Sequence, residues 1–265
     1  ISTSTGSTYG IYVASSGWGY TASVTNCLVQ NVKRDNAKSC KGISVTGFQA
    51  TTIENNTVKN VEWGRDTLVG DDKKDADGIS VFSHGGPEYK RSKATIVGNV
   101  IKNCEGRFIK LQTEGKTLVQ GNLMTIDGGL ELIQNFRGID SQVADASIID
   151  NKMYIGDEWT GGISAMFVTL QAVKSSTSHP DDPSTEEDEL ANNITEDWEP
   201  FYHRFEGNEI YAKKKFPYGI SAEPLKKGAK AQMWTIIKGN IVVSDDELDF
   251  TSEWYEDPSD TNSPQ

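Results

Sequence analysis

The chain is poor in cysteine and lacks long apolar segments. Its three cysteines among 265 residues are an odd number and too few for a disulfide scaffold, and their spacing matches no metal-binding motif. No apolar run is long enough to span a bilayer, and no segment has the pattern of a secretory signal peptide. We therefore predict a protein that is not inserted into a membrane and that needs no cofactor.

Positively charged residues are also scarce. The 26 lysines and arginines are outnumbered by 38 aspartates and glutamates, so the net charge is −12. A groove that binds nucleic acid needs a concentration of lysine and arginine to hold the phosphates. We therefore exclude nucleic acid as a partner and attribute the negative charge to solubility.

Helical periodicity is likewise missing. No stretch repeats apolar residues at a sustained helical spacing, and residues 184–192 are the one segment expected to form a short exposed helix. The 25 glycines, together with frequent serine, threonine and asparagine, are suited to many tight corners. This composition favours short strands connected by turns.

Two short strand patterns recur seven times in the same order. The first is a triplet of an apolar, an outward-facing and an apolar residue, usually introduced by glycine. Its copies are Ile11-Tyr12-Val13, Ile43-Ser44-Val45, Ile79-Ser80-Val81, Ile109-Lys110-Leu111, Leu130-Glu131-Leu132, Ile163-Ser164-Ala165 and Ile220-Ser221-Ala222.

The second pattern follows each triplet. It consists of an apolar residue, an asparagine three places later and another apolar residue two places after that. Asparagine occupies the middle position in six of the seven copies, and a cysteine replaces it in the first. The copies are Val24, Cys27, Val29; Ile53, Asn56, Val58; Ile96, Asn99, Ile101; Val119, Asn122, Met124; Ile148, Asn151, Met153; Phe205, Asn208, Ile210; and Ile237, Asn240, Val242.

These patterns predict a solenoid of short strands. A triplet with a period of two buries two side chains and exposes one, so each copy is too short to form a sheet alone. If each copy pairs with its counterpart in the next coil, about 4.8 Å away, the apolar residues form one continuous core. We expect the asparagine to lie at a fixed corner, to adopt the left-handed conformation and to bond to backbone or to the same amide one coil away.

The spacing between successive triplets varies from 21 residues (109 to 130) to 57 (163 to 220), so loops must project sideways from the coils. Functional residues are expected on these loops, because the strands are committed to packing. We predict one solenoid domain over 1–244, with an acidic insertion at 171–203, and a polar acidic tail at 245–265. Neither end carries a convincing cap, so we expect further protein or another subunit to adjoin the solenoid.

The motifs Gly42-Ile43-Ser44-Val45 and I-x-x-N-x-V-x-N, from Ile53 to Asn60, resemble those of the right-handed parallel β-helix in the pectin-lyase-like superfamily. The resemblance extends from near Tyr9 to about Ser244. It implies an all-β fold, a single-stranded right-handed parallel β-helix of about seven coils with side-loop insertions. Pectate lyases, other polysaccharide lyases, glycoside hydrolases and bacteriophage tailspikes share this fold. The motifs of pectate lyases are absent, so the resemblance does not imply pectin as the substrate.

Within this superfamily, the missing caps, the irregular aromatic insertions and the acidic surface look most like a bacteriophage tailspike or tail-fibre polysaccharide depolymerase. This resemblance implies a homotrimer in the virion tail that binds and cleaves an extended bacterial surface polysaccharide, either capsule or O-antigen. Two alternatives remain open. One is a non-catalytic structural or adhesive shaft, and the other is an extracellular polysaccharide lyase secreted by a bacterium.

A candidate site comes from the charged residues near the triplets of coils three to five. The middle residue of the triplet is charged on two neighbouring coils, as Lys110 and Glu131. Asp77 and Arg107 precede their triplets, and His84 and Glu114 follow theirs at equal distances. Stacking would place all six residues on one face. The alternative is that Lys110 and Glu131 form a surface ion pair that has no functional role and stabilises the fold by less than about 1 kcal/mol.

Glycoside hydrolysis is the chemistry that we prefer for this cluster. It needs two carboxylates, about 5 Å apart for retention of configuration or roughly 6.5 to 9.5 Å apart for inversion. Adjacent coils supply the shorter separation and alternate coils approximate the longer one. We therefore predict that the catalytic residues are Asp77, Glu114 and Glu131.

A lyase would use other members of the cluster. It would need a base, such as His84 or Lys110, and a cation such as Arg107 to neutralise the carboxylate of a uronate sugar. In either chemistry we expect these three residues to bind the substrate. Trp63 and Trp159, at the bases of loops, are expected to stack on sugar rings, the alternative being that they pack against the edge of a coil.

Two acidic segments have alternative interpretations. The insertion at 63–77 contains five aspartates and could bind Ca²⁺, but it lacks the ordered spacing of a calcium loop, so we prefer a solvated loop. The insertion at 171–203 is either a solvated arm or a flap that shapes a groove or contacts a neighbouring subunit.

Overall fold

The computed structural model of the chain describes residues 6–15, 19–35, 39–64, 75–82, 92–127, 137–156, 164–169, 201–213, 218–223 and 233–244. Within these ranges the chain forms the strands β1 to β19 and no helix. Among the same residues there is accordingly no helix long and apolar enough to cross a membrane. The helix expected at 184–192 and the tail at 245–265 lie outside the described residues.

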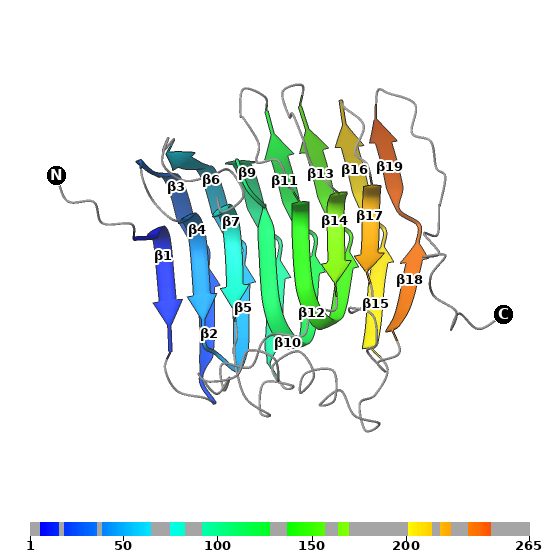
Figure 1. The fold of residues 1–265 in the computed structure, drawn as a ribbon, viewed down its shortest axis with the longest axis horizontal. Coiled ribbons are helices and arrows are strands. Elements are labelled where there is room, and N and C mark those ends of the chain that lie inside the picture. The colour runs from blue at the N-terminus through cyan, green and yellow to red at the C-terminus, as the bar shows by residue number, and fades with distance from the viewer. Residues whose placement is uncertain are drawn as a thin grey trace, which may run out of the picture.

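The strands build a parallel β-helix in which the extended segments of each coil lie on three faces (Figure 1). Neighbouring strands are parallel throughout the described part of the chain. The predicted fold class is therefore confirmed. What we call the first face contains, in spatial order, β1 (Thr8–Ala14), β4 (Ser39–Thr46), β7 (Asp75–Phe82), β10 (Ile109–Gln120), β12 (Arg137–Ile149), β14 (Ser164–Thr169) and β17 (Tyr218–Glu223).

The second and third faces follow the first in every coil. Two long strands, β10 and β12, bend from the first face into the second without a break, so their C-terminal halves pair there. The other strands of the second face are β2 (Thr21–Thr25), β5 (Ala50–Glu54), β8 (Lys93–Val97), β15 (Phe201–Glu206) and β18 (Met233–Lys238). The third face contains β3 (Leu28–Asp35), β6 (Thr57–Gly64), β9 (Val100–Cys104), β11 (Leu123–Ile126), β13 (Lys152–Ile155), β16 (Glu209–Ala212) and β19 (Ile241–Ser244).

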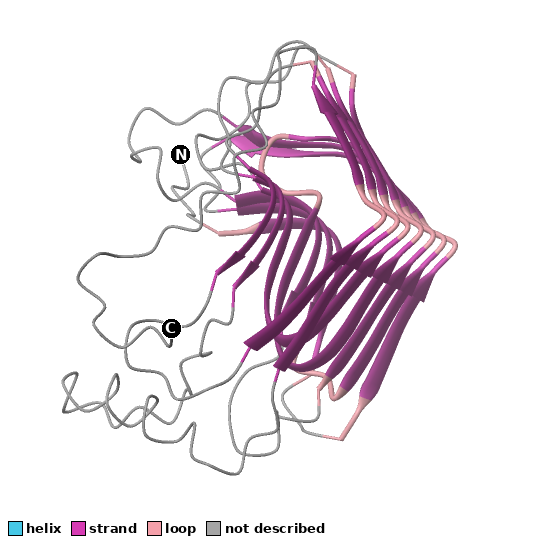
Figure 2. Ribbon diagram, turned by 90° about the vertical axis from the view of Figure 1, so that its right-hand side faces the viewer, coloured by secondary structure: helices cyan, strands magenta, loops and turns pink. Residues whose placement is uncertain are grey.

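The corner between the second and third faces is the most regular part of the fold. Its turns form an evenly stepped row at one edge of the molecule, on the right in Figure 2. In each coil only two residues separate the strand of the second face from that of the third. The long acidic segment predicted at 171–203 precedes this corner in its coil, and its last three residues belong to β15, which begins at Phe201.

The register confirms the second sequence pattern in every coil. Its first apolar residues pair from Val24 through Ile53 to Ile237. Its last apolar residues pair from Val29 through Val58 to Val242 in the same order. The residues between these positions therefore stack as well.

The first pattern is confirmed in five copies and wrong in two. Ile109 pairs with Ile139 rather than with Leu130, and Ile139 pairs with Met166 rather than with Ile163. The triplets of coils five and six are therefore Ile139-Asp140-Ser141 and Met166-Phe167-Val168. Leu130-Glu131-Leu132 lies outside the described residues. Ser164, the middle residue of the predicted sixth triplet, pairs with Arg137 instead of with Asp140, the middle residue of the fifth triplet.

Unusual side chains conceal the two true triplets in the sequence. Ser141 occupies the inward position that Leu111 holds in the preceding coil, and it is fully buried. Phe167 is in register with Asp140 and Ser221, at the middle position of the triplet, which serine occupies in several other coils. A more regular triplet precedes each of them, so the alternation of apolar residues alone selects the wrong register.

The interior of the coil is filled with aliphatic side chains, among them the fully buried Ile43, Ile53 and Ile79. Glycine precedes the triplet where the first face approaches the third. A Cβ atom on Gly42 would lie only 2.4 Å from Val58 Cγ1, so no larger residue fits there. Close packing of this kind explains why glycine introduces so many of the triplets.

A ladder of asparagine side chains runs through the corner between the second and third faces. The Oδ1 atom of Asn122 accepts hydrogen bonds from the backbone N–H and from Nδ2 of Asn99, both at 2.9 Å. Asn122 Nδ2 donates to the carbonyl oxygen of Ile96, also at 2.9 Å. The same arrangement repeats along the stack, and Cys27 joins it by donating its backbone N–H to Asn56. The ladder residues are Asn56, Asn99, Asn122, Asn151, Asn208 and Asn240.

The left-handed conformation belongs to the residue before each ladder position. Asn26, Asn55 and Asp150 have φ angles of 56°, 55° and 53°. Glycine takes this place in the other coils, as at Gly98 with a φ of 63°. The predicted bonding of the asparagines to one another is confirmed, whereas the predicted conformation was wrong by one residue. The two residues of the turn have different roles. The side chain of the ladder residue points into the interior, whereas that of the left-handed residue before it points to solvent.

The three cysteines are free thiols. Cys40 and Cys104 are fully buried, and Cys27 is half-buried in the first coil, where its Sγ lies 3.3 Å from the carbonyl oxygen of Thr25.

Replacing a central member of the ladder is expected to cost much more stability than replacing its last one. Asn122→Ala removes both an acceptor and a donor from a buried site and leaves Asn99 and Ile96 unsatisfied. We expect the free energy of unfolding to fall by about 3 kcal/mol. Asn240→Ala, at the partly exposed end of the ladder, should cost about 1 kcal/mol because water can replace the lost bonds. Equal losses for the two variants in urea denaturation would contradict a buried ladder.

Candidate functional site

The first face carries two outward side chains per coil near the start of its strands. In β4 they are Lys41 and Ser44, which flank the inward-facing Gly42 and Ile43. The same spacing recurs on the next three strands, so residues far apart in sequence lie about 4.8 Å apart, one strand from the next. The corresponding pairs are Asp77 and Ser80, Arg107 and Lys110, and Arg137 and Asp140.

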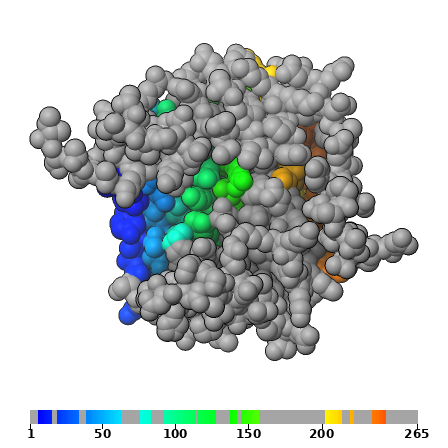
Figure 3. Space-filling view, viewed as in Figure 1, coloured from blue at the N-terminus to red at the C-terminus, as the bar shows by residue number. Residues whose placement is uncertain are grey.

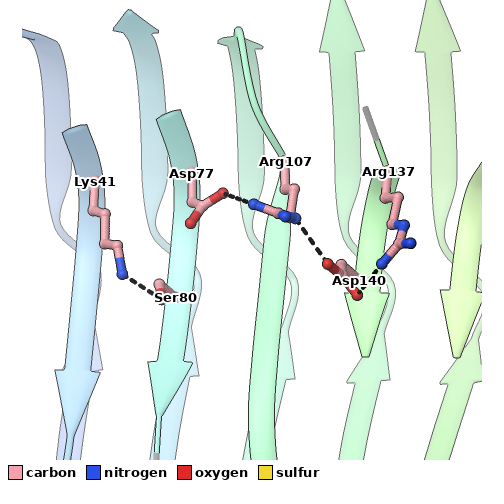
Figure 4. A network of polar contacts seen from close by, with 6 residues as sticks. All are labelled: Lys41, Asp77, Ser80, Arg107, Arg137 and Asp140. Carbon is pink, nitrogen blue, oxygen red and sulfur yellow. Dashed lines mark hydrogen bonds and ion pairs between the residues drawn. The ribbon is translucent and has the colours of Figure 1, made fainter. Parts of the chain in front are cut away.

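Arg107 bridges two aspartates that lie on the strands on either side of it (Figure 4). Its Nε donates to Asp140 Oδ2 at 2.8 Å, and its Nη1 donates to Asp77 Oδ1 at 3.3 Å. The other oxygen of Asp140 accepts from Nη1 of Arg137 at 3.5 Å. Two arginines and two aspartates therefore form one continuous network across β7, β10 and β12.

Lys41 extends the row by one strand. Its Nζ donates to the hydroxyl oxygen of Ser80 on β7 at 3.3 Å (Figure 4). Ser80 is in register with Lys110 on β10, and Lys110 with Asp140 on β12. Polar side chains thus follow the stacking axis over four successive strands.

Burial divides the network into an inner and an outer part. The side chains of Asp77 and Asp140 are 0% exposed, whereas those of Arg107 and Arg137 keep 14% and 21% of their surface. A carboxylate buried to this extent must be paired with a cation, because removing an unpaired charge from water is strongly unfavourable. Neither aspartate side chain is accessible to solvent in this structure. They hold the arginines in place, and the arginines present part of their side chains at the surface.

The interior behind this network contains the thiol of Cys104. Burial is the main cause that raises the pKa of Cys104 far above its usual range, and the negative charge of Asp77 raises it further. The thiol therefore stays protonated and does not act as a nucleophile in the native protein.

The structure brings together three of the residues predicted for the site. Asp77, Arg107 and Lys110 lie on adjacent strands of the first face, as expected. Asp77, however, is completely buried and paired with Arg107, so in this structure it is a residue that positions the arginine. Its predicted catalytic role stays a prediction.

The remaining predicted residues are placed only in part. Glu114 lies in β10 at the irregularity between Thr113 and Lys116, and Trp63 lies near the end of β6 on the third face. Of these two residues only the backbone is described. Glu131, His84 and Trp159 lie outside the described residues, and their roles stay predictions.

Sequence reasoning missed Asp140, Arg137 and Lys41. Asp140 occupies the outward position that had been assigned to Glu131, because the triplet of coil five begins at Ile139. A signal was available, since Gly138-Ile139-Asp140 has the same form as Gly42-Ile43-Ser44. The spacing from Ile109 to Ile139 also equals that from Ile79 to Ile109.

The described residues contain no group of three or more histidine, cysteine, aspartate or glutamate side chains that could hold a metal ion. Most of the aspartate-rich insertion at 63–77 falls between β6 and β7, outside the described residues. Calcium binding by that segment therefore stays an untested alternative.

Comparison with known proteins gives one match. Residues 9–176 match the family described as "Right handed beta helix region". This range covers more than half of the chain and includes the whole network from Lys41 to Asp140. Searches of curated proteins and of solved structures found no match.

Removing the bridging guanidinium is expected to destabilise the fold. Arg107→Met removes the guanidinium that pairs with the buried carboxylates of Asp77 and Asp140, so we expect a loss of about 3–5 kcal/mol in the free energy of unfolding. Arg204→Met is the matched control, because Arg204 pairs with Glu206 at an exposed site, where an ion pair is worth less than about 1 kcal/mol. Chemical denaturation of both variants measures the difference. Similar losses of unfolding free energy in Arg107→Met and Arg204→Met would show that the network around Arg107 is not buried.

Proposed function

Because the chain belongs to the right-handed β-helix family, we propose that it binds an extended bacterial surface polysaccharide, capsule or O-antigen, along its first face and cleaves it. The observation that carries this proposal is the row of outward polar side chains on the first face, whose partly exposed members are cations on β4, β10 and β12. The row advances by about 4.8 Å per strand, a repeat of the same order as that of an extended sugar chain. In the space-filling view, described residues from β1 (blue) to β12 (green) form a continuous band across this face (Figure 3).

The charges on this face favour an acidic polysaccharide. Among the described side chains that point out of β4, β7, β10 and β12 near the row, both carboxylates are buried and the partly exposed charged groups are cations. The chain as a whole carries a net charge of −12, so this concentration of cations is local. A guanidinium group matches the planar carboxylate of a uronate sugar with paired N–H donors. The cations are Lys41, Arg107, Lys110 and Arg137.

Elimination by a lyase mechanism is the cleavage that the described residues support best. It needs a base that removes the proton next to the uronate carboxylate and a cation that stabilises the negative charge formed. Lys110 and Arg107 point outward from neighbouring positions of one coil and suit these two roles. Hydrolysis would need two accessible carboxylates and would rest on Glu114 and Glu131.

We further propose that the β-helix belongs to a bacteriophage tailspike and acts as a homotrimer in the virion tail. The support is the smooth corner between the second and third faces, where each connection has two residues and leaves room for a neighbouring subunit. Sedimentation equilibrium of the chain is expected to give three times the monomer mass of 29.1 kDa. A monomer at every concentration measured would contradict the trimer and favour a secreted lyase.

Incubation with a panel of bacterial polysaccharides tests binding and chemistry together. We expect binding to acidic members, weakened by salt, and an increase in ultraviolet absorbance from unsaturated uronates. New reducing ends without that absorbance would indicate hydrolysis. Binding without cleavage would indicate an adhesive shaft, and no binding to any member would contradict the proposed function.

Removing one cation should weaken binding. Lys110→Ala is expected to lower the affinity for an acidic polysaccharide about tenfold, or about 1.4 kcal/mol. Lys59→Ala is the matched control, since it removes the same charge from the outer side of β6 on the third face. Equal effects of the two substitutions would show that binding is not located on the first face.

A further inference from the structure

The first coil carries two exposed tyrosines that the proposed site does not use. The rings of Tyr9 and Tyr12 stack, with their centroids 4.5 Å apart and an angle of 21° between their planes. Their exposed fractions are 36% and 53%. Large apolar rings exposed side by side on a soluble protein commonly mark an interaction site.

The local backbone explains why two tyrosines three residues apart point the same way. Gly10 and Ile11, which separate them, both face the interior. A Cβ atom on Gly10 would lie 2.3 Å from Val29 Cγ1, and Ile11 packs against the hydrophobic core. The residues on either side of this inward pair must therefore point outward, where the two rings meet.

Strand register places this tyrosine pair at one end of the polar row. Tyr9 pairs with Lys41 on the next strand, which is the first cation of the row. Tyr12 pairs with Ser44, and that column continues through Ser80 to Lys110. The pair is thus three strands, or about 14 Å, from Lys110 along the stacking axis.

We propose that Tyr9 and Tyr12 form an aromatic subsite that stacks on a sugar ring of the same polysaccharide, about three sugar units from the unit beside Arg107 and Lys110. This inference rests on the proposed function. An aromatic ring packs against the apolar C–H face of a sugar, and the tyrosine hydroxyl remains available as a hydrogen-bond partner. Because the two rings already hold each other in place, little conformational entropy is lost when the sugar binds.

This subsite makes affinity depend on the length of the ligand. A disaccharide held at Arg107 and Lys110 is too short to reach the tyrosines, whereas a chain of four or more units can span both sites. The position of the pair also defines the path of the bound chain, which covers the first face between β10 and β1.

The test uses oligosaccharides of graded length prepared from the polysaccharide that the wild-type protein binds. Tyr12→Ser introduces the residue found at the equivalent positions 44 and 80, so the strand should tolerate it. Tyr12→Phe keeps the ring and should keep the length dependence. Tyr154→Ser is the matched control, because Tyr154 is 40% exposed and stacks on Tyr211 at 5.2 Å on the third face.

Isothermal titration calorimetry is expected to show that Tyr12→Ser weakens binding of the long oligosaccharides about two- to tenfold and leaves disaccharide binding unchanged. Tyr154→Ser should change neither. The subsite is wrong if Tyr12→Ser weakens short and long ligands equally, or weakens long ligands no more than Tyr154→Ser does. If the wild-type protein binds no polysaccharide at all, the proposed function fails and the subsite fails with it.

Discussion

Parallel pairing of equivalent strands, one coil upon the next, is the constraint on which the rest of the molecule depends. It fixes the separation of neighbouring coils and decides which side chains meet. The asparagine ladder secures this pairing at one corner, because each amide accepts from the preceding coil and donates back to it. A shift of one residue would break every rung and turn the apolar side chains outward.

The charged network is a consequence of the same register. Arg107 can bridge Asp77 and Asp140 only because these three residues come from three successive strands. The two fully buried aspartates hold the arginines in place through these ion pairs. The partly exposed arginines are thereby fixed in orientation before any ligand arrives, which reduces the entropy lost on binding.

The two proposals share one physical basis, which is the regular spacing of outward side chains along the first face. A rigid row suits a ligand that is itself a repeating chain, because several weak contacts can form at once without rearrangement of the protein. The polar row supplies charge complementarity near its centre, and the tyrosine pair supplies an apolar surface at its end. Affinity would then come from the sum of contacts along the stack rather than from one deep pocket.

The sequence by itself determined the fold class and most of the register. Asparagine recurs with apolar residues at fixed distances, and this pattern identified every strand pairing around the ladder corner, from Val24 and Val29 to Ile237 and Val242. It did so because the apolar residues must face inward and the asparagine must lie at the corner at the same time. Only one register in each coil meets both requirements.

Tertiary structure alone decided which triplets stack in coils five and six, and therefore which carboxylate joins the site. The alternation of apolar residues tells which side chains of a segment face inward, but two nearby segments can satisfy it equally well. Pairing with the strands of the neighbouring coils selected Ile139 over Leu130 and so placed Asp140 beside Arg107. Contacts of this kind depend on distances between separate coils, which local periodicity does not specify.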